Sequence, residues 1–141
     1  MYLTAKRYLH QFKLEDKLIA EKIKEIFGTN LTCNEVCFNV GYWRKANAIH
    51  AWFVSNVQDG VDNCKEYYVE VEQLKQLLKL VEQVLTNHSE AEALLPSQAG
   101  FFFGNTEYDE SYFIDLEDTK KILEKVIKLE ENYDIYYSSS W

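Results

Sequence analysis

Hydrophobic residues recur every three or four positions in three stretches of the chain, the spacing of an amphipathic helix. These stretches cover 14–27, 71–86 and 110–131. Gly28 follows the first of them and supplies a stop, because glycine tolerates the left-handed conformation that commonly ends a helix. The pattern therefore predicts three long helices, each with one buried face.

Alternating hydrophobic residues, which are typical of strands, occur in shorter runs. Residues 36–40 alternate strictly, and 66–69 has strand character. The aromatic segment 133–141 closes the chain, and its composition favours a strand tied to a sheet. Between these runs, 89–92 predicts a helical turn, and the phenylalanines of 101–103 predict either a short buried strand or a loop plugged into the core.

A fourth helix, predicted over 42–57, is apolar around nearly its whole circumference. Such a helix belongs in the middle of a domain. Arg44, Asn47 and His50 nevertheless lie on it, and polar groups that are carried into an interior must find partners. The segment is therefore either the central post of the fold or the wall of a ligand pocket.

Helices outweigh strands in this pattern, and no tight hairpin turns join the strands. We predict an α+β fold with about four main helices and a small antiparallel sheet. At 141 residues the chain fits a single compact domain over 1–141. Within it we expect a weakly attached N-terminal region, 1–13, and a C-terminal aromatic strand, 133–141.

The acidic net charge of the chain excludes some classes of binding partner. The net charge of −8 argues against direct DNA or RNA binding, which needs clustered Lys and Arg, and against an anionic membrane surface. No stretch approaches the eighteen or so apolar residues of a membrane span. The cysteine count is odd, at three, which favours a reducing cytoplasm over a disulfide-bonded secreted setting.

A candidate anion site lies at the start of the aromatic helix. Arg44 and Lys45 there would join helix amides and dipole in binding a phosphate. The alternative is that Arg44 pairs with one of the many acids. In the first case Tyr42 and Trp43 are candidates for stacking on a base, and Asn47 and His50 for directional contacts.

A second block, 100–109, could complete that site. Phe102 could stack on a base or belong to the core, whereas Asn105, Thr106 and Asp109 could accept hydrogen bonds from a ligand. Asp109 could instead cap the helix that starts near Glu110.

Catalysis and metal binding have weaker support. His50 could act as a general base, but no Ser or Cys stands in a recognised nucleophile context, and a satisfied core histidine is the alternative. Cys33 and Cys37 are separated by three residues, without the second pair that a zinc site would need. We expect no catalytic residue, no metal ligand and no cofactor.

Several motifs together resemble a family of small proteins from tailed bacteriophages and prophages. They are the segment Tyr-Trp-Arg-Lys-Ala-Asn at 42–47 with Ile-His and Trp-Phe-Val after it, Gly-Phe-Phe-Phe-Gly at 100–104, Thr-Glu-Tyr-Asp at 106–109 and Ser-Ser-Trp at 139–141. The similarity spans roughly 36–141. It implies a protein that works in the cytoplasm of an infected bacterium, the host cytoplasm, and it implies no catalytic residue.

Three functions follow as hypotheses. The first is a non-enzymatic phage accessory protein that binds a small anionic, nucleotide-like ligand as a counter-defence sponge. The second is an interaction module that inhibits a host or phage factor through the aromatic tail and the acidic segment 107–118. The third is a small hydrolase that uses His50 and carboxylates. Self-association as a homodimer would fit the abundant aromatics and the apolar tail.

Overall fold

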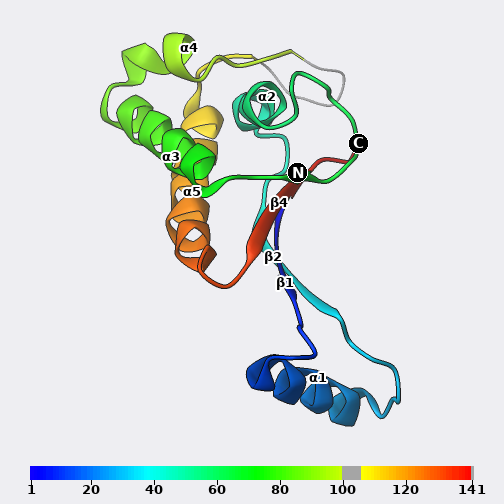
Figure 1. The fold of residues 1–141 in the computed structure, drawn as a ribbon. Helices are drawn as coiled ribbons and strands as arrows, with labels where there is room; N and C mark the ends of the chain where they lie inside the picture. Colours follow the sequence, from blue (N-terminus) through cyan, green and yellow to red (C-terminus); the bar gives the residue numbers. More distant parts are fainter. Residues whose placement is uncertain (100–105, 141) are drawn as a thin grey trace.

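The computed structural model describes residues 1–99 and 106–140. Within these residues the chain forms a four-stranded antiparallel sheet and five α-helices (Figure 1). The α+β prediction is therefore confirmed, with one short helix more than the four main helices expected. In chain order the elements are β1 (Tyr2–Tyr8), α1 (Leu14–Phe27), β2 (Glu35–Tyr42), α2 (Asn47–Asn56), β3 (Tyr67–Tyr68), α3 (Val71–Thr86), α4 (Ala91–Leu94), α5 (Glu110–Val126) and β4 (Asp134–Ser138), with 3-10 turns at His88–Glu90 and Ile127–Leu129.

The sheet has the strand order β2-β1-β4-β3, so β1 pairs on both sides. This corrects the expectation of a weakly attached region at 1–13. Leu3 and Ala5 are buried in the core, whereas Thr4 and Lys6 alternate with them and are only partly buried. With only two core positions, one of them a small alanine, followed by a Lys-Arg pair, β1 gave almost no alternating signal in the sequence.

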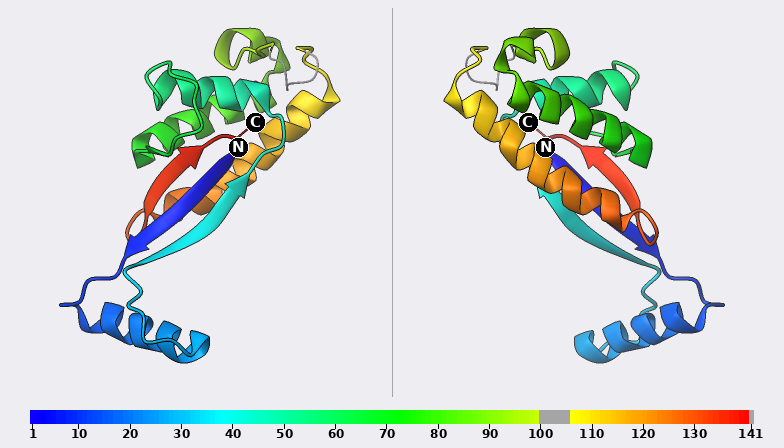
Figure 2. Two further views of the ribbon diagram at one scale, coloured as in Figure 1. Left: turned by 90° about the vertical axis from the view of Figure 1, so that its right-hand side faces the viewer. Right: turned by 90° about the vertical axis from the view of Figure 1, so that its left-hand side faces the viewer.

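Helix α5 crosses one face of the sheet, and α3 packs against α5 on the side away from the strands (Figure 2). The buried faces of these helices supply much of the core, as their hydrophobic spacing predicted. The side chain of Phe53 on α2 stacks on Tyr137 of β4, with 4.0 Å between ring centroids. Because β4 lies between β1 and β3, the described part of the aromatic tail belongs to the sheet.

The aromatic helix is shorter than predicted. Residue Tyr42 ends β2, where it pairs with Tyr2, and α2 begins only at Asn47. Between them Lys45 has a φ of 71°, a left-handed conformation that no α-helix can contain. The remaining ten residues of α2 are central, as expected, with seven of them buried.

Helix α1 lies apart from the rest of the molecule, at the end of the stem that β1 and β2 form (Figure 1). Its bounds are those predicted, but its environment is not. The amphipathic pattern predicted a buried face, whereas Asp16 is the one buried residue of this helix. None of the residues of α1 belongs to the hydrophobic core of the described chain.

Candidate functional site

A cavity of about 300 Å³ lies where the first turns of α2 and α5 come together. Its lining residues are Arg44, Lys45, Ala46, Asn47, Ala48, Ile49, Ser97, Glu107, Asp109, Ser111, Tyr112, Asp115 and Leu116. The helix amides at both starts carry the positive end of the helix dipole, which favours an anion. Its volume is at the lower end of the range that is typical of small-molecule sites.

Four of the predicted binding residues meet in this cavity: Arg44, Lys45, Asn47 and Asp109. The Asn47 side-chain oxygen accepts a hydrogen bond from Ser97 Oγ at 3.1 Å, which fixes its orientation at the start of α2. Asp109 caps α5, because its carboxylate accepts a hydrogen bond from the Tyr112 amide at 3.1 Å. The capping role considered for Asp109 is therefore confirmed, and it holds the residue at the cavity wall.

Two exposed cations face this cavity without an ion pair. Within the described ranges, neither Arg44 nor Lys45 forms a salt bridge, although three carboxylates line the same space. The expected alternative, an Arg44 paired with an acid, is absent from this part of the chain. Lys45 is also held in the left-handed region, which typically costs a non-glycine residue about 1 kcal/mol or more and is concentrated at functional sites.

Asp115 is the carboxylate that stands out. It is half-buried on α5, and its side chain accepts no hydrogen bond from the residues that the structure describes. Burial, followed by the charges of Asp118 and Asp109, raises the pKa of Asp115 to about 6. Neither composition nor periodicity pointed to this residue, because it sits on α5 among many other acids.

The other predicted residues that the structure describes do not line the cavity. Trp43 is buried in the core, where its indole nitrogen donates to Thr119 Oγ1 at 2.8 Å. Tyr42 is exposed at the end of β2, against the ring of Tyr2. Thr106 is exposed outside the cavity lining. Phe102 and Asn105 lie outside the described residues, as does the segment 101–103 for which a strand or plugged loop was considered.

His50 has a structural position. Its Nδ1 lies 2.7 Å from the Tyr137 hydroxyl and its Nε2 lies 3.2 Å from Asp62 Oδ2. Burial, followed by the charge of Asp62, raises the pKa of Tyr137, so its hydroxyl keeps its proton and is able to donate to Nδ1. An imidazole that accepts at Nδ1 would carry its own proton on Nε2, where Asp62 is the acceptor. Both ring nitrogens therefore link α2 to β4 and to the loop after α2, which argues against His50 as a general base.

The described ranges, 1–99 and 106–140, contain neither a metal-binding cluster nor a membrane-spanning helix. No group of three His, Cys, Asp or Glu side chains there is arranged to hold a metal ion. None of the helices described is long and apolar enough to cross a bilayer. Cys33, Cys37 and Cys64 all lie outside any disulfide bond.

No family model, curated protein or solved structure matches this chain. The resemblance to bacteriophage proteins stays a prediction.

Proposed function

We propose that this chain is a non-enzymatic binding protein that holds a small, nucleotide-like anion in the cavity between α2 and α5. One observation carries the proposal: among the described residues, two cations without salt-bridge partners and a partly buried carboxylate without a hydrogen-bond donor line the same recess. Opposite charges that line one cavity commonly pair with each other, and no salt bridge joins these within the described residues. Kept apart, Arg44, Lys45 and Asp115 can each meet a different part of one ligand.

The mixed charge indicates what the ligand carries. A bare polyphosphate would meet Glu107, Asp109 and Asp115 as well as the cations, so repulsion would offset much of its attraction. A ligand with one phosphate and a hydrogen-bonding base avoids this conflict. Its phosphate would lie at Arg44, Lys45 and the first amides of α2.

The base would then face α5. A carboxylate accepts two hydrogen bonds from a pair of neighbouring donors, and guanine presents such a pair on one edge. Asp115 supplies this acceptor, and Tyr112 supplies an aromatic wall. A cavity of about 300 Å³ suits a mononucleotide better than a dinucleotide. We therefore expect guanosine monophosphate to bind more tightly than the other mononucleotides.

The biological setting that we propose rests on the resemblance to bacteriophage proteins. In the cytoplasm of an infected bacterium, a protein that holds a nucleotide-like signal without converting it would act as a sponge. Such a role requires affinity and abundance, and it requires no catalytic group.

A thermal-shift experiment tests the proposal. At 100 times its dissociation constant a ligand adds about 2.7 kcal/mol to the free energy of unfolding, which raises the melting temperature by several degrees. We expect this shift with guanosine monophosphate and a smaller one with adenosine or uridine monophosphate. Arg44→Ala and Asp115→Asn should each lose most of it, whereas Lys79→Ala, an exposed lysine on α3, should keep it.

Two results would contradict the proposal. One is the absence of a shift with every mononucleotide. The other is a shift that Arg44→Ala and Lys79→Ala reduce equally, because general charge and not the cavity would then explain binding.

A further inference from the structure

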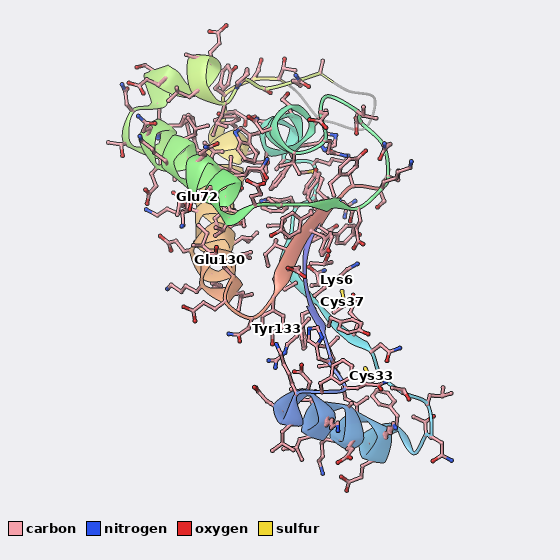
Figure 3. All side chains as sticks on the ribbon, in the orientation of Figure 1. Lys6, Cys33, Cys37, Glu72, Glu130 and Tyr133 are labelled. Atoms are coloured by element: carbon pink, nitrogen blue, oxygen red, sulfur yellow. The ribbon has the colours of Figure 1, made fainter. Side chains whose placement is uncertain are left out.

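The α1 arm, residues 10–33, exposes more large apolar side chains than any other part of the described chain. Phe12 is 95% exposed, Phe27 76% and Leu14 73%, and Leu18, Ile26 and Leu31 are also exposed. Figure 3 shows side chains of α1 extending away from the fold, with Cys33 where the chain returns toward β2. Proteins that work as monomers rarely expose contiguous apolar patches above a few hundred Å².

The arm is nevertheless held in a defined position. The Arg7 guanidinium at the end of β1 binds Asp16 Oδ1 at 2.6 Å, and the amide of His10 donates to Asp16 Oδ2 at 3.0 Å. Beside Arg7, the pKa of Asp16 is lowered. The apolar face of α1 is therefore presented at a fixed angle to the stem.

A helix in this position also needs support from outside its own fold. Isolated helices shorter than about 12–15 residues are marginal in water, and helices in proteins gain most of their stability from packing. Helix α1 has 14 residues, with no side-chain cap at its start and no contact with the core. Contact with another apolar surface would supply the missing stabilisation.

We propose that α1 packs against α1 of a second copy of this chain, in a two-fold symmetric dimer. This inference is independent of the ligand proposed for the cavity. The six exposed side chains of the arm offer at most on the order of 800 Å² per copy, which is the share of each partner in a standard interface. A symmetric contact also requires the same patch on both partners, which α1 provides to itself.

Charge supports a second copy as the occupant. Residues 10–33 carry four lysines and four acids, so the arm is neutral, and the net charge of −8 belongs to the rest of the chain. Two molecules that meet through their arms keep their acidic bodies apart, because α1 lies at the far end of the stem (Figures 1 and 2).

Sedimentation velocity over a concentration series tests the dimer. We expect wild-type protein to sediment with twice the chain mass of 16.6 kDa. Leu18→Glu and Phe27→Glu should weaken the dimer at least tenfold. The matched control is Val61→Glu, a change at an exposed apolar residue outside the arm, and it should leave the dimer intact. Circular dichroism of each variant shows whether the fold is retained.

A cross-linking measurement keeps the test decisive if a glutamate variant unfolds. With the three native cysteines replaced by serine, Leu18→Cys should give covalent dimers with a short bis-maleimide, whereas Val61→Cys should not. A wild-type monomer at all concentrations would overturn the proposal. So would a dimer that survives both glutamate variants, or equal cross-linking at the two cysteines, because another face would then form the contact.

Discussion

At the residue scale, the cavity is lined by one carboxyl group, that of Asp115, whose ionisation is unfavourable in the folded protein. Burial and the neighbouring Asp118 and Asp109 raise the pKa of Asp115 from 3.8 to about 6. The folded protein therefore binds more protons than the unfolded chain between these two values, and this residue's contribution to stability is lost as the pH rises through about 6. A strained carboxylate of this kind is typical of a site that serves a ligand.

Replacement of Asp115 tests this electrostatic account. Asp115→Asn should raise the free energy of unfolding at pH 7.5 by about 1 kcal/mol, since a half-buried carboxylate is still partly screened by solvent. At about pH 3 the two proteins should be nearly equally stable, because the carboxyl is then protonated in both the folded and the unfolded chain. Thermal denaturation at both pH values measures the difference. An equal gain at pH 7.5 from Glu117→Gln, an exposed residue of the same helix, would contradict it.

A second residue carries an unsatisfied polar group. Gln58 is 1% exposed, and neither atom of its amide has a hydrogen-bond partner among the described residues. An unpaired buried amide typically costs about 1–3 kcal/mol. Gln58→Met keeps the shape and removes the amide, so it should stabilise the protein by about 1 kcal/mol in urea unfolding. A loss of stability would show that the amide has a partner in solution.

At the element scale, the sheet approaches α5 closely at Gly41. A Cβ on Gly41 would lie 2.7 Å from Ile122 Cγ2 and 3.3 Å from Leu3 Cβ. Glycine therefore lets β2 sit beside both β1 and α5. Strand β2 ends just before Arg44 and Lys45, which line the cavity, so the close packing at Gly41 also determines where these two residues lie.

Gly41→Ala should destabilise the protein by about 1–3 kcal/mol, the usual cost of overpacking. The atom nearest to the added Cβ is a methyl carbon of Ile122, which Ile122→Ala removes. Gly41→Ala should therefore destabilise the Ile122→Ala protein less than it destabilises the wild type. Chemical denaturation of both single variants and the double variant measures this coupling. Strict additivity would contradict the packing argument.

The elements also show what the sequence could and could not predict. Helices at 14–27 and 71–86 have the predicted bounds, since hydrophobic spacing and local stop signals determine them. The central strand β1 was missed because strand pairing is non-local and its inward face has only Leu3 and Ala5. The start of α2 was misplaced because the left-handed Lys45 is not a glycine and left no mark in the pattern.

The candidate site was predicted in the same uneven way. Arg44, Lys45 and Asn47 were found because they share one short segment with a helix start. Asp115 was not found, because its place in the cavity depends on how α5 lies against α2. Trp43 and His50 were predicted to bind a ligand because they are polar-bearing residues in an apolar segment. Their polar atoms instead form hydrogen bonds with partners inside the fold.

At the scale of the whole molecule, the two proposed contact sites lie at opposite ends of the chain's fold. The cavity lies at the starts of α2 and α5, and the apolar arm lies at the opposite end of the β1–β2 stem (Figure 1). In the dimer proposed here, two cavities would face away from the shared contact. Ligand binding and self-association should therefore be independent, so Leu18→Glu should leave ligand affinity unchanged.

Calorimetric titration of the purified protein with guanosine monophosphate tests the central claim, that the cavity holds a small nucleotide-like anion. We expect saturable binding of one ligand per chain, at least a tenfold loss in Arg44→Ala, and no loss in Lys79→Ala. Heat of dilution alone, or the same affinity in wild-type and Arg44→Ala protein, would contradict the account.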